Sequence, residues 1–273
     1  MIPLIRVREQ IQNRRYLLAM LEVRELTKRY PTVTAIDDVS FTVRPYEVLG
    51  YLGPNGSGKS TTVNIVTGLL EPTRGQVLFD GRSIQSQLIE YKRRLGYVPE
   101  QPHLYPHLTG REYLQLTGRL RGLGGRALDR KIDDLLQLFA LGAARHSPIA
   151  SYSKGMRQKV LISAALLHNP DILVFDEPLS GLDVTSALVF RNLVKSLSRE
   201  GKVILYSSHV LEVVEKICTQ VMILRKGRVA ANDTVENLRS LMQRGSLEDI
   251  FSELVLEQDI ETTASAIVEV MKG

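Results

Sequence analysis

Cysteine is almost absent from this chain of 273 residues, since Cys218 is the only one. A single cysteine excludes an internal disulfide and indicates a reducing compartment. Long apolar runs are missing too. Runs such as 160–167 and 203–208 fall well short of the roughly 20 apolar residues that a membrane-spanning helix needs. With no internal repeat and no low-complexity linker, the sequence predicts a globular protein that does not cross a membrane by itself.

A strong net charge is also lacking. The formal charge is +5, and residues 1–19 hold four arginines (Arg6, Arg8, Arg14 and Arg15) against Glu9, which leaves only +2 for the chain from Met20 onward. This balance gives little support to a nucleic-acid partner. An apolar fraction of 44% with 24% charged residues is ordinary for a globular protein and argues against disorder.

Residues 1–19 lack the apolar core and small-residue cleavage site of a secretory signal. They form either an amphipathic helix that lies on a surface or a poorly ordered extension. We favour the extension, because strand-like alternation begins only with "MLEVRELTKRY" at Met20.

Strand and helix patterns alternate from Met20 to about residue 240, which predicts an α/β body. Apolar runs at 172–175 and 203–206 suit strands that are buried on both faces of a parallel sheet. Residues 86–155 have leucines three and four apart and predict a helical subdomain inserted in this body. Residues 241–273 read as an amphipathic helical tail. The expected divisions are therefore 1–19, 20–240 and 241–273.

The segment "GPNGSGKS" matches a phosphate-binding loop at every fixed position and lies between a predicted strand and a predicted helix. Its glycines let backbone N–H groups turn toward phosphate oxygens, and the helix that follows adds its positive end. Lysine supplies a point charge, and the last serine offers a hydroxyl to Mg²⁺. The segment contains Gly53, Pro54, Asn55, Gly56, Ser57, Gly58, Lys59 and Ser60.

Two carboxylates and a histidine follow the predicted buried strands. Asp176 and Glu177 end the run "ILVFDEP", where the first suits a Mg²⁺ ligand and the second a general base toward the attacking water. His209 ends the next run, "SSH", from which it can reach a γ-phosphate. A lone histidine at a strand end is more often structural, so taken alone it is the weaker candidate.

In this order the motifs closely resemble the ATP-binding subunit of ABC transporters over roughly residues 20–240. The resemblance implies that Tyr30 stacks on adenine and that Thr61 follows the phosphate loop. It implies that Asp183 of "SGLD" is the acid of a loop that crosses between two subunits, and that His209 is the switch histidine. It also implies a P-loop NTPase core with a mainly parallel sheet, an antiparallel β portion near the N-terminus and the helical insertion.

The segment "YSKGM" resembles the five-residue signature of that family, usually Leu-Ser-Gly-Gly-Gln. Ser153 and Gly155 match, whereas Tyr152, Lys154 and Met156 do not. Ser153 can donate a hydrogen bond to a γ-phosphate oxygen, and it can also cap the helix that begins there. Both roles are compatible, and Gly155 lets backbone approach closely.

A further departure lies in "GYVPEQPHLYPHL", where the family usually has a glutamine that senses Mg²⁺ and water. The aligned residue is Glu100, and Gln101 stands beside it. We favour Glu100 as the residue in this role, because a carboxylate can bind Mg²⁺ or accept hydrogen bonds from water. A shift of one residue would instead assign Gln101.

The resemblance implies an ATPase that uses ATP and Mg²⁺, dimerises head to tail and energises a separate membrane permease. It would lie peripherally on the cytoplasmic face of the membrane, with a second ATP-binding subunit as partner. Likeness to the ABC-2 branch favours export. The alternative is an ABC ATPase that acts on ribosomes or DNA, but such relatives usually carry two ATPase units or a long coiled coil, and this chain has one phosphate loop.

Overall fold

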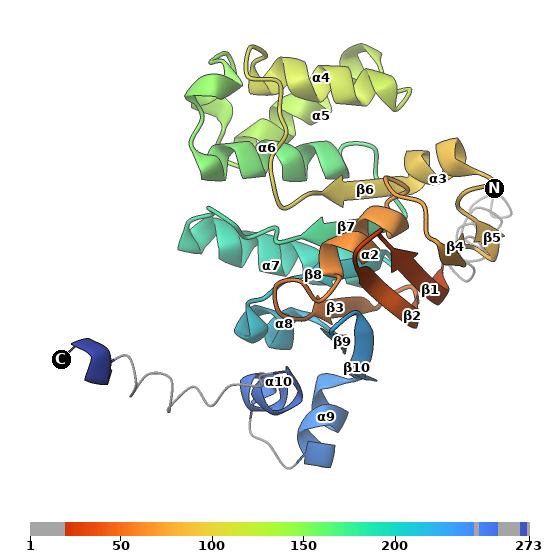
Figure 1. Cartoon of the computed structure of the whole chain (residues 1–273). Coiled ribbons are helices and arrows are strands. Elements are labelled where there is room, and N and C mark those ends of the chain that lie inside the picture. The colour runs from red at the N-terminus through yellow and green to blue at the C-terminus, as the bar shows by residue number, and fades with distance from the viewer. Residues whose placement is uncertain (1–19, 243–245, 256–267, 272–273) are drawn as a thin grey trace, which may run out of the picture.

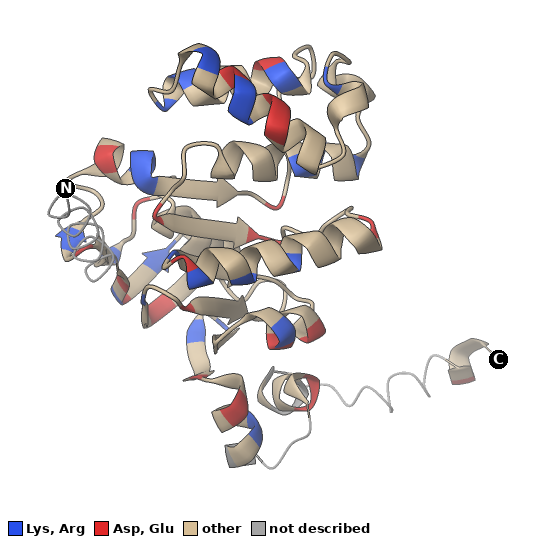
Figure 2. Ribbon diagram, turned by 180° about the vertical axis from the view of Figure 1, so that it is seen from behind, with Lys and Arg blue, Asp and Glu red and all other residues tan. Residues whose placement is uncertain are grey.

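A computed structural model describes residues 20–242, 246–255 and 268–271. The N-terminal extension expected at 1–19 therefore lies outside the described residues. The described part combines a central sheet, a smaller antiparallel sheet and a separate layer of helices (Figure 1). Figure 2 shows that the charged residues lie mainly on helices and connecting loops, while the strands of the central sheet are mostly uncharged.

The smaller sheet is antiparallel and has the strand order β2-β1-β4-β5. Its first pair is joined by a short turn, and polar–apolar alternation along β1 and β2 leaves one face buried and the other exposed. Its strands are β1 (Leu21–Arg29), β2 (Thr34–Val43), β4 (Arg74–Phe79) and β5 (Arg82–Ser83).

The central sheet has the order β10-β9-β3-β8-β7-β6, and every neighbouring pair except β10–β9 is parallel. Every residue of β3, β7 and β8 is buried, as expected for parallel strands covered on both faces. The strands are β3 (Val48–Leu52), β6 (Leu95–Val98), β7 (Ile172–Asp176), β8 (Val203–Ser207), β9 (Gln220–Arg225) and β10 (Arg228–Asp233).

The helices cover the sheet or form the separate layer. They are α2 (Lys59–Val66), α3 (Leu88–Arg94), α4 (Gly110–Leu120), α5 (Gly125–Leu138), α6 (Lys154–Leu166), α7 (Val184–Arg199), α8 (Leu211–Ile217), α9 (Val235–Met242) and α10 (Leu247–Val255). Two short 3₁₀ turns, Gly142–Ala144 and Ile149–Ser151, connect α5 to α6.

Three apolar cores hold these layers together. The first lies between the antiparallel sheet, α2 and one face of the central sheet, and the second lies on the opposite face under α6, α7 and α8. The third joins α4, α5 and α6. Helix α6 contributes Leu161 and Ile162 to the second core and Val160 to the third, so it connects the helical layer to the sheet.

The predicted α/β class is confirmed, with a mostly parallel central sheet and an antiparallel sheet near the N-terminus. The lower boundary of the helical region at residue 86 needs correction, because β6 pairs with β7 at the edge of the central sheet. Tyr91 of α3 is also buried in the core beneath the antiparallel sheet. A four-residue apolar strand has too little periodicity to be distinguished from helix in the sequence.

Candidate functional site

The phosphate-loop segment connects β3 to α2 in the backbone conformation that its glycines allow. Gly56 and Gly58 have φ angles of 77° and 105°, which side chains rarely tolerate. A Cβ on Gly58 would also lie 2.5 Å from the Ala35 carbonyl oxygen. Among the described residues, no side chain caps the start of α2, so its first N–H groups face the space in front of the loop. This arrangement favours an anionic ligand.

Lys59, the first residue of α2, folds back over the loop. Its Nζ donates to the carbonyl oxygens of Gly53 at 2.5 Å and Pro54 at 3.1 Å. Burial lowers the pKa of this ammonium group, while the nearby carboxylates of Glu177, Asp176 and Glu100 oppose that shift. The lysine thus lies among carboxylates that face the same space.

Asp176 and Glu177 stand at the carboxyl end of β7, beside the corresponding end of β8. Burial raises the pKa of Asp176 to about 6, with negative Glu100 and Glu177 adding to the rise and Lys59 opposing it. Glu177 has a φ of 47°, a left-handed conformation that is costly for a glutamate. Its N–H donates to the Ser207 carbonyl at 3.0 Å, so the turn is held against β8.

The Glu177 carboxylate is aimed by the loop that follows β8. Its Oε1 accepts from the His209 backbone N–H at 2.8 Å and lies 2.7 Å from the imidazole Nδ1 of His209. Its Oε2 accepts from the Ser208 hydroxyl at 3.2 Å. The Glu177 side chain is 14% exposed and that of His209 is 71% exposed. The pair thus presents a positioned carboxylate and an accessible imidazole to the same opening.

A cavity of about 830 Å³ brings these groups together. The candidate residues that line it come from the phosphate loop, α2 and three loops at the ends of β6, β7 and β8: Asn55, Gly56, Gly58, Lys59, Ser60, Thr61, Glu100, Asp176, Glu177 and His209. Gln101 is not among the lining residues, whereas Glu100 is. The cavity can accept a polyphosphate at the phosphate loop, with carboxylates and an imidazole facing it.

A second group of candidate residues lies on a different surface. Ser153 caps α6 by accepting from the Met156 N–H at 3.2 Å, which confirms the capping role. A Cβ on Gly155 would lie 2.5 Å from the Gly181 carbonyl oxygen, so the close approach is to the "SGLD" loop. Asp183 caps α7 by accepting a hydrogen bond from the Ser186 N–H. Its Oδ2 lies 3.6 Å from the Nζ of Lys159.

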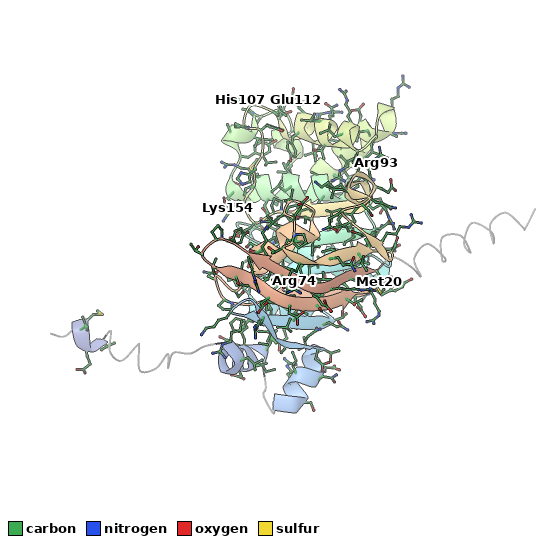
Figure 3. The ribbon with its side chains drawn as sticks, turned by 45° about the vertical axis from the view of Figure 1, so that its right-hand side comes forward. Met20, Arg74, Arg93, His107, Glu112 and Lys154 are labelled. Atoms are coloured by element: carbon green, nitrogen blue, oxygen red, sulfur yellow. The ribbon has the colours of Figure 1, made fainter. Side chains whose placement is uncertain are left out.

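None of Ser153, Gly155 and Asp183 lines the cavity of its own chain. Figure 3 places Lys154 at the edge of the molecule, between the helical layer with His107 and Glu112 and the antiparallel sheet with Arg74 and Met20. Ser153 and Asp183 are exposed as well, so another molecule can contact this group.

Comparison with known proteins agrees with this geometry. The family model described as "ABC transporter" matches residues 36–180. The ABC transporter ATP-binding protein NatA of Bacillus subtilis (strain 168) is 39% identical over 237 residues, which are 85% of this chain and 96% of NatA. The chain belongs to the ABC transporter family. It is an ATP-binding subunit and an ATPase of the kind that drives transport.

Two other relatives of this ABC subunit are informative. The linearmycin resistance ATP-binding protein LnrL of Bacillus subtilis (strain 168) is 34% identical over 81% of this chain and 71% of its own length. A solved structure of an ATP-binding subunit of an ABC transporter superposes with a TM-score of 0.81 at 35% identity, covering 86% of this chain and 99% of that chain. Among the described residues of this subunit, no helix is long and apolar enough to cross a membrane.

Tyr30 precedes the cavity-lining residue Val33 in the sequence but does not line the cavity itself. Its side chain is 41% exposed, and the Lys28 ammonium lies 5.5 Å from the ring centroid. Its backbone exchanges hydrogen bonds with Val33, and Val33 does line the cavity. Stacking on adenine therefore stays a prediction for this residue.

A further wall of the phosphate-loop cavity was not predicted from the sequence. It consists of Val33, Thr34, Ala35, Lys226 and Gly227. The β9–β10 turn at Lys226 reaches the phosphate loop because β9 pairs with β3. There the Gly227 N–H donates to the Ser57 carbonyl at 3.1 Å. No local motif marks this turn, because its place follows from strand order alone.

The candidate Mg²⁺ ligands Ser60, Asp176 and Glu100 all supply oxygen, the donor that Mg²⁺ prefers. In the described part of the chain, no group of three His, Cys, Asp or Glu side chains is placed to hold a metal alone. This fits Mg²⁺, which usually binds one or two protein oxygens together with substrate phosphates and water. The buried Asp176 with its raised pKa also fits, because a cation would offset its charge.

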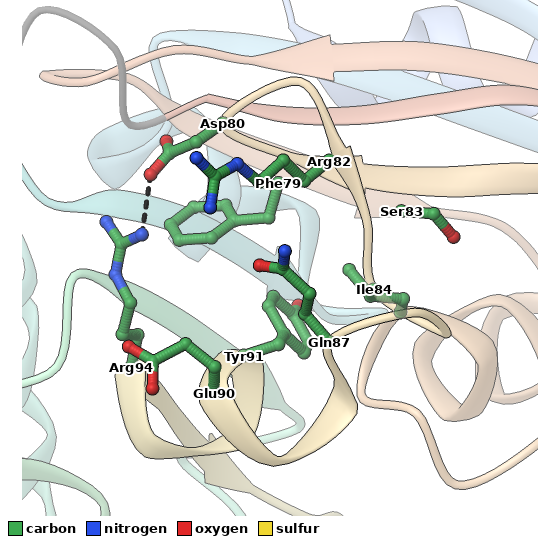
Figure 4. A pocket seen from close by; sticks show the side chains of 9 residues that line it. All are labelled: Phe79, Asp80, Arg82, Ser83, Ile84, Gln87, Glu90, Tyr91 and Arg94. Carbon is green, nitrogen blue, oxygen red and sulfur yellow. Dashed lines mark hydrogen bonds and ion pairs between the residues drawn. The ribbon is translucent and has the colours of Figure 1, made fainter.

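A separate cavity of about 330 Å³ lies between the β4–β5 hairpin and α3 (Figure 4). Arg94 bridges Asp80 at 2.5 Å and Asp171 at 2.6 Å, and its guanidinium lies 4.5 Å from the centroid of the Phe79 ring. These contacts tie α3 to both sheets. This cavity shares no residue with the phosphate-loop cavity, so we assign its side chains a structural role.

Proposed function

We propose that this subunit energises a separate permease of an ABC exporter by ATP-driven, head-to-tail dimerisation. The observation that carries this proposal is the division of the candidate residues between two surfaces. Lys59, Asp176, Glu177 and His209 gather in one cavity, while Ser153, Gly155 and Asp183 lie outside it. A second subunit in the opposite orientation would bring its α6 N-terminus to the phosphates of the first.

Catalysis in this proposal rests on positioning and on charge. Lys59 and the N-terminus of α2 offset phosphate charge, and Glu177 orients and deprotonates the attacking water. His209 steadies the γ-phosphate while its backbone N–H and imidazole aim the Glu177 carboxylate. Ser60, Asp176 and Glu100 would hold Mg²⁺, which would supply positive charge beside the phosphates.

The hydrogen bonds at the phosphates join the two subunits only while the nucleotide is intact. Hydrolysis would therefore release the dimer, and the helices α4 and α5 would carry the change to the permease on the cytoplasmic face of the membrane. Export is favoured because a relative of comparable length bears the name of a resistance protein. Resistance to a toxic compound is a function that efflux supplies.

Complementation between two inactive variants tests the shared site. Lys59→Ala damages the phosphate loop, and Ser153→Arg places a bulky side chain on the opposite surface. Each variant alone is expected to lose ATPase activity. A mixture forms some dimers with one intact site, made of the phosphate loop of one chain and the signature of the other.

We expect the mixture to recover up to about a quarter of parental activity, because half of the dimers are mixed and each holds one intact site of two. A mixture as inactive as its components, although size exclusion shows mixed dimers, would refute the shared site. We call the surface with Ser153, Gly155 and Asp183 the signature surface. Full ATPase activity of Ser153→Arg would refute a role for this surface in hydrolysis. Affinity capture from detergent-solubilised membranes tests the partner, and recovery of ribosomes without a polytopic membrane protein would overturn the transporter assignment.

A further inference from the structure

Helix α8 begins two residues after His209 and has only seven residues, Leu211–Ile217. A helix of this length is marginal by itself in water, so its position depends on packing against neighbours. The His209 side chain is 71% exposed and is not held by packing. Its contacts with Glu177 are the backbone N–H, which donates to Oε1 at 2.8 Å, and the imidazole Nδ1, which lies 2.7 Å from the same oxygen. Because the backbone then enters α8, a shift of α8 would move His209 relative to Glu177.

One face of α8 packs on the central sheet. A Cβ on Gly50 of β3 would lie 2.5 Å from Val214 Cγ1 and 3.0 Å from Cys218 Sγ, so these side chains rest directly on the strand. Val214 and Ile217 are buried in the second core. Apolar contact of this kind is strong but not directional. It holds this face of α8 against the sheet.

The other face of α8 carries Glu215, which meets both C-terminal helices. Its carboxylate forms an ion pair with the Arg239 guanidinium of α9. The same Oε1 accepts from the Leu247 N–H at 3.3 Å, at the start of α10, where a helix favours negative charge. The Glu215 side chain is only 19% exposed. These contacts are directional, and they connect α8 to two other elements at once.

The C-terminal helices are themselves anchored to the body. Leu247 and Ile250 of α10 and Leu238 of α9 are buried in the second core, on the side of the sheet that α8 covers. Figure 1 shows α9 and α10 together at the end of the molecule beyond β9 and β10. Glu215 thus links α8, and with it the loop of His209, to α9 and α10, which lie far from the phosphate loop in the sequence.

We propose that Glu215 is a positioning residue for hydrolysis, which holds His209 over Glu177 by clamping α8 to α9 and α10. The C-terminal helices are then part of the catalytic apparatus. This inference rests on the role proposed above for His209. It assigns to the C-terminal segment a task in the chemical step, separate from nucleotide binding, which the phosphate loop performs.

Steady-state ATPase kinetics of the full chain test the proposal with three variants: Glu215→Ala, His209→Ala and the double variant. We expect Glu215→Ala to lower kcat about tenfold with KM for ATP within about twofold, because a misplacement of about 1 Å can cost up to about a hundredfold. The double variant should be no slower than His209→Ala alone, because Glu215 acts through that residue.

Glu212→Ala is the matched control. Glu212 lies on the same helix, is exposed and forms an ion pair with Lys216 of the same helix, so its loss should leave kcat unchanged. If Glu215→Ala does not fold, Glu215→Gln replaces it. That variant keeps an acceptor for the Leu247 N–H but loses the charge facing Arg239, and it should show an intermediate kcat.

The outcomes separate the two ideas. Loss of kcat in His209→Ala with none in the Glu215 variants would overturn this inference and leave the proposed function standing. Effects of Glu215→Ala and His209→Ala that add in the double variant would overturn it too, because they would show a general loss of structure. Full activity of His209→Ala would instead refute the proposed function.

Discussion

The cavity and the signature surface differ in the kind of chemistry that they hold. The cavity contains several groups that can hold or transfer a proton, namely Lys59, Glu100, Asp176, Glu177 and His209. The signature surface offers a helix start capped by Ser153 and a backbone contact between Gly155 and Gly181. One region can do acid–base chemistry and the other can only complement charge. This difference predicts distinct consequences when each is altered.

The largest effect is expected for Glu177→Gln. An amide cannot take a proton from water, so hydrolysis should fall by about a thousandfold or more, while the amide oxygen can still accept from the His209 backbone N–H. ATP should remain bound in a stable dimer, detected by size exclusion and by nucleotide retention. Glu200→Gln, an exposed change after α7, serves as the control. Hydrolysis by Glu177→Gln at the parental rate would show that another group is the base.

Gly155→Ala alters only the signature surface. The new methyl would lie 2.5 Å from the Gly181 carbonyl oxygen, so the "SGLD" loop must shift. We expect ATPase activity to fall about tenfold or more, because the two subunits no longer meet correctly at the phosphates. Binding of a fluorescent ATP analogue to the isolated subunit should not change.

Gly124→Ala is the control for this variant. A Cβ on Gly124 meets nothing within 4 Å, and its backbone is extended. Weakened nucleotide binding in Gly155→Ala would contradict the separation of the two regions.

Glu100 and Gln101 are neighbours in the sequence and test which residues at the edge of the cavity affect hydrolysis. Glu100 lines it and Gln101 does not. In a transporter reconstituted with its permease, Glu100→Ala should lower coupled hydrolysis by about tenfold and Gln101→Ala by about twofold or less, because only the first removes a group that faces the phosphates. Equal or reversed effects would assign the sensing role to Gln101.

The buried Asp176 carboxylate lowers the stability of the fold when it is ionised. Because its pKa is raised to about 6 in the folded chain, ionised Asp176 destabilises the fold at pH values above its ordinary pKa. This effect should be fully present above pH 6 and should be relieved as the pH falls from about 6 toward 4. Asp176→Asn should therefore raise the free energy of unfolding at pH 7.5 by about 1–3 kcal/mol.

Urea unfolding at pH 7.5 and pH 5 measures the free energy of unfolding of the parent and of Asp176→Asn. The difference between the two proteins in this free energy should be smaller at pH 5. Mg²⁺-dependent ATPase activity of the parent should fall over the same range, because the protonated carboxyl no longer attracts the cation. A gap that widens on acidification would mean that the Asp176 pKa is not raised.

The smallest effect is expected in the helical layer, away from both regions. Thr109 caps α4 and exchanges hydrogen bonds with Glu112 in a capping box. Thr109→Ala should cost about 1 kcal/mol of stability and leave ATP binding unchanged. Thr109→Ser keeps the cap and is the control. Thermal unfolding together with nucleotide binding provides the measurement, and a loss of binding would show that this layer supports the cavity.

Most of the cavity could be predicted because its chemistry is local in the chain. The phosphate loop depends on glycines within eight residues, and Asp176 and Glu177 follow a strand whose buried character is visible in its composition. Prediction from the sequence failed where an element is short or where it lies far along the chain from the residues that it contacts. Strand β6 has four residues and looked like part of the helical region, and the Lys226–Gly227 turn carries no motif.

The sequence by itself determined the α/β class, the phosphate loop and the residues at the ends of β7 and β8, because each depends on neighbours within one turn or one strand. Only the tertiary structure decided that Glu100 and the Lys226 turn face the same cavity, that the signature lies outside it, and that Glu215 joins α8 to α9 and α10. The reason is physical. Strand order and helix docking are set by burial of apolar surface between segments far apart in the chain, and no local pattern records which segments will meet.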